Sequence, residues 1–262
     1  MTTINDVVSH LDLVFRPELQ EDYDNSGFLL GDGGKPYSGA LVALDLTDAV
    51  ADEALELGLN MIVTHHPFIF GGVKRITDHT ATGRLIQKLV LGGMAVYAAH
   101  TNLDNLAWGV NGELCGRLGL HGCRIMRPQK PGGDTGAGMV GELESDTPCD
   151  EFLGRVKSIL GLAALRCTPH DARQPVRRVA VCGGAGSFLI EDALAAGADI
   201  YLTADLKYHD FQRTERGMVL ADVGHYESEQ FAKDIIFRTL SEKFCNFACR
   251  ISGRQGSLIR CM

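Results

Sequence analysis

Short apolar runs and stretches of helical periodicity alternate along the N-terminal part of the chain. Apolar residues at helical spacing predict helices at about 7–15, 48–57 and 81–91. Continuous apolar runs predict buried strands at 40–44, 61–63 and 94–99. Because strands joined by helices pair in parallel, this order indicates an α/β fold.

The same alternation returns after residues 127–138, a segment rich in proline and glycine that we predict to be a linker. Further strands are predicted at 179–182, 200–202, 218–223 and near 247–251, with helices at 190–196 and 230–240. We therefore expect an α/β protein of two lobes. The first comprises residues 1–126 plus 226–262, and the second comprises residues 127–225.

The two halves resemble each other in the order of their residues. Residues 54–64 and 193–203 align without a gap as helix, glycine, strand and threonine. The next strand of each half is followed by a histidine and, four residues later, by an acid: His100 and Asp104, then His225 and Glu229. Chance similarity of two α/β units explains the helices and strands well but the shared histidine–acid spacing poorly. We predict an internal duplication, with the lobes related by a pseudo-two-fold axis and one cleft between them.

Two adjacent histidines, His65 and His66, end the apolar run that begins at Met61. Pro67 cannot donate a hydrogen bond to a neighbouring strand, so the strand is predicted to end at the histidines. Open α/β sheets bind ligands at the carboxyl ends of their strands. The alternative is a pair of ordinary strand-end histidines.

Imidazole and carboxylate groups at these strand ends favour a metal site. They are the usual ligands of Zn, Mn, Fe, Co and Ni in catalytic sites. Neighbouring strand-end histidines point to opposite sides, which suits two ions, and a glutamate can bridge ions about 3.5–4 Å apart. We predict two divalent ions held by five ligands, which leaves a position open for water: His65, His66, Asp104, His225 and Glu229.

Other residues give weaker signals. His100 is either a sixth ligand or a hydrogen-bond partner of a ligand. Asp205 and His209, four residues apart, are predicted to share a helix face and to contact substrate, to hydrogen-bond a metal ligand or to lie in solvent. The glycine-rich segment 183–187 lacks the pattern of a nucleotide-binding loop, which favours a tight turn.

Composition narrows the class of protein. The chain has 262 residues, ordinary globular composition and a formal net charge of −8, which disfavours nonspecific nucleic-acid binding. No apolar run is long enough for a membrane helix, and the N-terminal residues do not resemble a signal peptide. The eight cysteines form no CxxC motif, as expected for free thiols in a reducing compartment. We expect a cytoplasmic protein without a membrane partner.

Five motifs together resemble the dinuclear-metal-centre hexameric protein family, whose members are often named GTP cyclohydrolase 1 type 2 homologs. The motifs lie at residues 24–27, 64–67, 100–104, 181–187 and 224–229. The resemblance implies a two-domain α/β subunit, a toroidal homohexamer and a two-metal site facing the internal cavity. The family's ligands fall on the same five residues, and the resemblance implies that Glu229 bridges the metals.

Three functions compete at this stage. The first is a metal-dependent hydrolase acting on a small nucleotide-like substrate; with GTP, water would add at C8 of the purine, open the imidazole ring and release formate. The second is a non-enzymatic hexameric assembly that binds metal or encircles nucleic acid. The third is a single structural zinc. The catalytic acid and base are not identified by the sequence.

Overall fold

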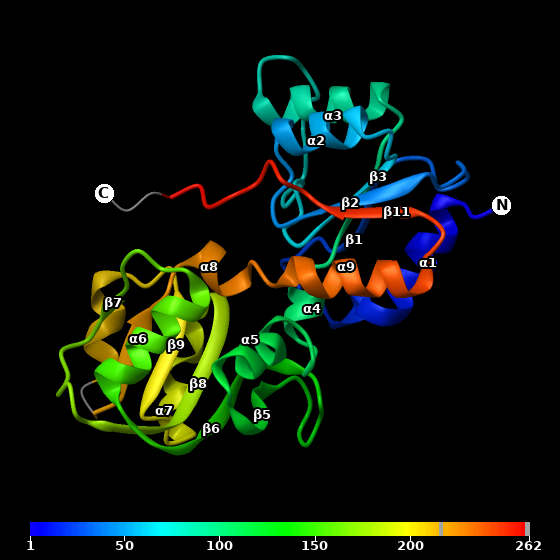
Figure 1. The fold of residues 1–262 in the computed structure, drawn as a ribbon. Coiled ribbons are helices and arrows are strands. Elements are labelled where there is room, and N and C mark those ends of the chain that lie inside the picture. The colour runs from blue at the N-terminus through cyan, green and yellow to red at the C-terminus, as the bar shows by residue number, and fades with distance from the viewer. Residues whose placement is uncertain (215–216, 260–262) are drawn as a thin grey trace. The chain divides into compact units, whose positions relative to one another are not determined.

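The computed structural model describes residues 1–214 and 217–259 as a mixed α/β chain with two sheets (Figure 1). The chain divides into two compact units: unit 1 is Met1–Leu103 with Ala232–Gly256, and unit 2 contains Asp104–Phe231. The first boundary falls inside the short helix α4 (Thr101–Asp104), and the second follows helix α8 (His225–Glu229). The sequence analysis places these boundaries at 126/127 and 225/226. Each unit contains one of the sheets.

The sheet of unit 1 has the strand order β1-β4-β3-β2-β11. Its strands are β1 (Gly27–Leu30), β2 (Gly39–Ala43), β3 (Met61–Thr64), β4 (Ala95–Ala98) and β11 (Ala248–Ile251). The last four are parallel, and β1 runs antiparallel to β4. The strands predicted at 40–44, 61–63 and 94–99 are confirmed. Because β3 is the central strand, the residues after Thr64 emerge at the middle of the carboxyl edge.

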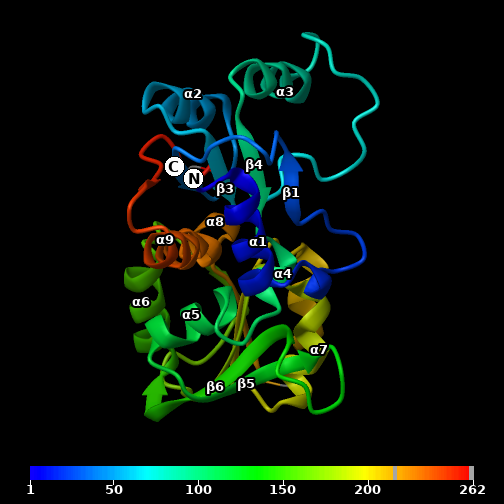
Figure 2. The same ribbon diagram turned by 90° about the vertical axis from the view of Figure 1, so that its right-hand side faces the viewer.

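Helices cover both faces of this sheet. The helices α2 (Asp48–Glu56) and α3 (Ala81–Leu91) lie on one face, and α1 (Ile4–Phe15) and α9 (Ala232–Lys243) lie on the other (Figure 2). A short 3-10 helix, η1 (Pro17–Leu19), follows α1. Leu41, Ile62 and Val96 pack with α2 and α3 in one buried cluster. Coverage on both faces explains why β2, β3 and β4 are fully buried and almost entirely apolar.

The sheet of unit 2 has the strand order β5-β6-β8-β9-β10-β7. Its strands are β5 (His121–Pro128), β6 (Gly136–Pro148), β7 (Arg166–Cys167), β8 (Pro175–Ala185), β9 (Ile200–Ala204) and β10 (Val219–Asp222). Strands β8, β9 and β10 are parallel, and the other pairs are antiparallel. The strands predicted in the second lobe are confirmed.

Each face of the second sheet packs in its own buried cluster. The helices α5 (Val110–Leu118) and α6 (Cys149–Leu160) pack on the face that contains Val179, Ile200 and Val219. The opposite face, with Tyr201 and Leu220, packs against α7 (Ile190–Ala195) and the 3-10 helices η2 (Ser187–Leu189) and η3 (Tyr208–Thr214). The parallel strands are therefore buried from both sides, as in unit 1.

The two sheets share an arrangement of four strands. In unit 1 the order β2-β3-β4 is parallel and ends in the antiparallel β1; in unit 2 the order β8-β9-β10 is parallel and ends in the antiparallel β7. Of the two aligned sequence segments, residues 54–64 include β3 and residues 193–203 include most of β9. This shared topology agrees with the predicted duplication, which itself stays a prediction.

The segment 127–138 is part of a β-hairpin, so the prediction of a linker there is wrong. Residues 127–128 end β5, residues 136–138 begin β6, and the two strands pair antiparallel. Proline and glycine mark tight hairpin turns as well as linkers. Gly138 has a positive φ of 62°, which a residue without a side chain adopts at low cost.

Candidate metal centre

The two adjacent histidines lie where the apolar run predicts, just after strand β3. The backbone amides of His65 and His66 donate to the carbonyls of Ala43 and Leu44, so both residues continue the pairing with β2. The His65 side chain is fully buried, while that of His66 is 21% exposed. Pro67 then takes the chain away from the sheet edge, because it has no amide hydrogen to continue the ladder.

His100 joins the two adjacent histidines in a group within unit 1. It follows β4, the strand beside β3. One nitrogen from each of His65, His66 and His100 lies within 4.8 Å of the others, and the ring centroids are 5.0–5.5 Å apart. The three imidazoles form a group that could hold a metal ion.

An acceptor orients each imidazole of this group through Nδ1. His65 donates to the carbonyl of Ala99, His66 to the carboxylate of Asp45, and His100 to the carboxylate of Asp24, each across 2.7 Å. A backbone carbonyl can only accept, so Nδ1 of His65 carries the hydrogen and Nε2 of the neutral ring carries the lone pair. The same tautomer suits His66 and His100, and this arrangement is typical of metal-ligating histidines.

Asp24 is buried and remains ionised. Burial by itself would raise its pKa, but hydrogen bonds from His100 and Thr101 hold the pKa well below its ordinary value. Thr101 donates both its amide, over 3.0 Å, and its hydroxyl, over 2.5 Å, to the same carboxylate oxygen. A negative charge is therefore fixed behind His100.

His225 and Glu229 lie one turn apart on helix α8 of unit 2. Nε2 of His225 is 2.9 Å from Oε2 of Glu229, and Nδ1 is 2.8 Å from Oδ2 of Asp205. The imidazole thus lies between two carboxylates. Both contacts are favourable if the ring is doubly protonated, if Glu229 is protonated, or if a cation lies at Nε2 and Glu229.

Asp104 supplies another carboxylate near Glu229. An oxygen of each side chain lies within 4.8 Å of the other, and Glu229 is only 3% exposed. Burial raises the pKa of the neighbouring Cys182 thiol to about 12, and the charges of Asp104 and Glu229 contribute to the rise. Carboxylates this close favour a cation, because they repel each other when both are ionised.

The glycine-rich segment at the end of β8 makes room for Glu229. A Cβ atom at Gly183 would lie 3.3 Å from Cγ of Glu229, and one at Gly184 would lie 2.0 Å from its Oε1. The amide of Gly184 donates to the hydroxyl of Ser228, which further fixes α8 against the strand. The turn predicted in this segment therefore positions a candidate ligand.

The structure separates the two residues predicted to share a helix face. Asp205 has a positive φ of 56° just after β9 and contacts His225, whereas His209 is exposed on η3 and contacts Gln212. The prediction of a common helix face is wrong, because the chain makes a left-handed turn at Asp205 before η3 begins. Asp205 orients a candidate ligand, and His209 is not part of any metal-ligand group found among the described residues.

The sequence analysis missed Asp45, and it identified Asp24 only within a motif. Asp45 follows the end of β2, the strand next to β3, so its position after a buried strand was an available signal. Asp24 is 76 residues from His100, and no local pattern connects them.

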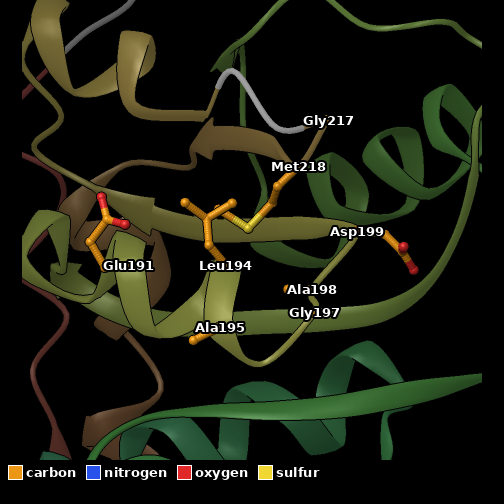
Figure 3. A pocket seen from close by; sticks show the side chains of 8 residues that line it. All are labelled: Glu191, Leu194, Ala195, Gly197, Ala198, Asp199, Gly217 and Met218. Carbon is orange, nitrogen blue, oxygen red and sulfur yellow. The ribbon is translucent and has the colours of Figure 1, made fainter.

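Unit 2 also has a surface pocket, which Figure 3 shows from close by. It is lined by Glu191, Leu194, Ala195, Gly197, Ala198, Asp199, Gly217 and Met218. Residues 197–199 precede β9 and residues 217–218 precede β10, so the pocket lies at the amino ends of the strands. Asp205 and His225 follow the carboxyl ends of the same strands, and the pocket therefore does not belong to the candidate metal centre.

The candidate ligands of unit 1 are imidazole nitrogens, and those of unit 2 are an imidazole nitrogen and carboxylate oxygens. These donors fit divalent transition metals and are found in sites that keep a position open for water. Every cysteine in the described ranges is a free thiol, and none belongs to a group of candidate metal ligands there. The donor set therefore differs from that of a structural zinc site rich in cysteine.

The chain is similar to a large set of known proteins over most of its length. It is 34% identical to the "GTP cyclohydrolase 1 type 2 homolog" of Clostridium perfringens, over 86% of both chains. It is 30% identical to the "Protein NIF3 homolog" of Schizosaccharomyces pombe, over 88% of this chain and 86% of the relative. Among solved structures, Staphylococcus aureus protein SA1388 superimposes with a TM-score of 0.90 at 26% identity, covering 100% of this chain and 99% of that one.

No helix in residues 1–214 and 217–259 has the length and apolar character needed to cross a membrane.

A family model described as Duf34/NIF3 (NGG1p interacting factor 3) matches residues 2–254. This match spans both sheets and every candidate ligand. The chain therefore belongs to the Duf34/NIF3 family.

Proposed function

We propose that the chain holds a pair of divalent metal ions through His65, His66, Asp104, His225 and Glu229. The observation that carries the proposal is the common orientation of four imidazoles, since each of His65, His66, His100 and His225 has an acceptor at Nδ1. Metal-ligating histidines almost always have such an acceptor, which fixes the tautomer and directs the other nitrogen to the metal. The candidate metals are Zn, Fe, Mn, Co and Ni.

The proposal joins the ligands of the two units in one centre. Asp104 follows His100 by four residues and ends helix α4, which begins at Thr101. Asp104, a candidate ligand of unit 2, thus lies only four residues after His100 of unit 1. Glu229, with two carboxylate oxygens, would bridge the ions, and five ligands for two ions would leave room for a reactant.

We propose that this centre makes the protein a metal-dependent hydrolase of a small nucleotide-like substrate. Bound divalent ions supply Lewis acidity and lower the pKa of water toward neutrality. The chain's own residues fix the direction of the imidazoles: Asp24, Asp45 and Asp205 each accept from a histidine Nδ1. Relatives named GTP cyclohydrolase 1 type 2 homolog support a purine nucleotide as the first substrate to test.

We further propose a cytoplasmic homohexamer in the form of a ring. The resemblance of the motifs supports the ring, and the free thiols in the described ranges support a reducing compartment. Light scattering after gel filtration measures the mass of the assembly, which a hexamer would place at six times the 28.3 kDa of the chain.

Formate release from GTP tests the activity. The protein is loaded separately with Zn, Mn, Fe, Co and Ni and incubated with GTP, other nucleotides and general phosphoesters. We expect hydrolysis of at least one nucleotide and its loss in Glu229→Gln. If metal-loaded protein hydrolyses none of them, the non-enzymatic assembly replaces the hydrolase as the better description.

A further inference from the structure

We propose that Tyr23 and Phe70 form a platform on which the aromatic ring of the substrate stacks, beside the metal ligands of unit 1. This inference rests on the proposed function and specifies its substrate class, a nucleotide. Both rings are large and yet exposed, with 63% of Tyr23 and 51% of Phe70 accessible to solvent. They pack against each other with centroids 6.3 Å apart and planes inclined by 44°.

The platform adjoins the histidine group directly. The Phe70 ring lies 5.9 Å from the His100 ring, at an interplanar angle of 75°. His100 in turn lies 5.3 Å from His65 and 5.5 Å from His66, measured between ring centroids. A planar ligand stacked on Phe70 would therefore lie next to the imidazoles that we propose as ligands.

One turn of the chain fixes both aromatic residues relative to the histidines. Tyr23 precedes Asp24, the carboxylate that orients His100. Asn25 donates its side-chain amide across 2.6 Å to the carbonyl of Ile69, the residue before Phe70. The turn at residues 23–25 therefore carries Tyr23, supplies the acceptor of His100 and binds the loop of Phe70.

Stacking and charge point to a nucleotide. Aromatic faces bind the flat face of any base, because every base offers a π surface. Lys74 and Arg75 follow Phe70 on the same exposed loop, while Glu21 and Asp22 precede Tyr23, so the positive charge lies on the Phe70 side of the platform. This combination favours an aromatic ring that carries phosphate over an uncharged heterocycle.

Calorimetric titration of the metal-loaded full chain with GTP, ATP and inorganic triphosphate tests the platform. We expect Phe70→Leu and Tyr23→Leu each to weaken nucleotide binding by about fivefold to a hundredfold. Triphosphate binding and metal content stay unchanged, and Phe70→Trp retains nucleotide affinity. The matched control is Phe188→Leu, which removes a phenyl ring of similar exposure (47%) from unit 2 and should change nothing.

Three outcomes would overturn the platform. In the first, both leucine variants bind nucleotide as tightly as the unchanged chain. In the second, the unchanged chain binds neither nucleotide. In the third, the substitutions change only the mass of the assembly, which would make the two rings a contact between copies. Failure of the proposed function looks different. In that case nucleotides bind in a Phe70-dependent manner, but the protein holds no stoichiometric metal or hydrolyses nothing.

Discussion

Gly184 lies directly against the carboxylate of Glu229: a Cβ atom on residue 184 would be 2.0 Å from Oε1. Gly184 also has a φ of 62°, in the left-handed region that favours glycine. The end of β8 can therefore approach helix α8 only with glycine at this position. The position of Glu229, and with it the proposed metal bridge, depends on a residue that carries no chemistry of its own.

Gly184→Ala should lower metal affinity at least tenfold, because the added methyl group displaces Glu229. The substitution also strains the backbone by about 1 kcal/mol, which lowers the melting temperature. Metal titration and thermal unfolding measure the two effects. Gly116→Ala on helix α5 is the control, since a Cβ atom there meets no atom within 4 Å and alanine favours a helix. Unchanged metal affinity in Gly184→Ala would contradict the proposed role of Glu229.

Asp45→Ala should weaken metal binding by about tenfold to a hundredfold, because it removes the acceptor that orients His66. The histidine itself remains, so this variant separates orientation from loss of a ligand. Competition with a chromophoric chelator gives the affinity. Asp78→Ala removes an exposed carboxylate of the same unit and should leave the affinity unchanged. Equal affinities in the two variants would show that Asp45 plays no part.

The hydrogen bonds of the His170 ring make a pH-dependent contribution to the free energy of unfolding. The carbonyl of Thr168 and the carboxylate of Asp150 accept hydrogen bonds from its ring and raise the pKa of His170 above its ordinary value. A raised pKa stabilises the fold fully below the pKa of the unfolded chain, and this stabilisation is lost as pH rises through the folded pKa.

Denaturant unfolding at pH 5 and pH 8.5 checks this behaviour in the Asp150→Asn variant. The variant should be destabilised relative to the unchanged chain at pH 5 and much less so at pH 8.5. Proton NMR of the His170 ring should show a lower pKa in the variant. Equal destabilisation at both pH values would mean that the charge of His170 is not involved.

Metal binding should raise the melting temperature, because an ion that binds only the folded chain stabilises it. At a free metal concentration of 100 times Kd the gain is about 2.7 kcal/mol for one site. Glu229→Gln should lose most of this gain, whereas Glu227→Gln, two residues away on the same helix, should keep it. A melting temperature that does not respond to any of the candidate metals would argue against a metal centre.

Much of the fold follows from the sequence pattern. The apolar runs predict the central parallel strands because both faces of each sheet are covered, and Pro67 predicts where β3 ends. The hairpin of β5 and β6 escaped prediction, since proline and glycine also punctuate linkers. The helix face predicted for Asp205 and His209 was wrong for a different reason: the left-handed backbone of Asp205 is rare for a residue other than glycine, so the helical spacing was misleading.

The candidate site was predictable only in its chemically distinctive members. Adjacent histidines at a strand end and two histidine–acid pairs at the same spacing stand out in the sequence. The acceptors behind them do not, because an aspartate in a loop resembles any solvated turn residue until the fold brings it to an imidazole. Asp24 and His100 are such a pair, 76 residues apart. The exposed rings of Tyr23 and Phe70 were missed for the same reason.

The metal content of the purified full chain tests the central claim most directly. Elemental analysis by mass spectrometry should find two equivalents of a divalent transition metal per chain, and less than one in Glu229→Gln. A chain that binds no stoichiometric metal, or a Glu229→Gln variant that holds as much metal as the unchanged protein, would contradict the account.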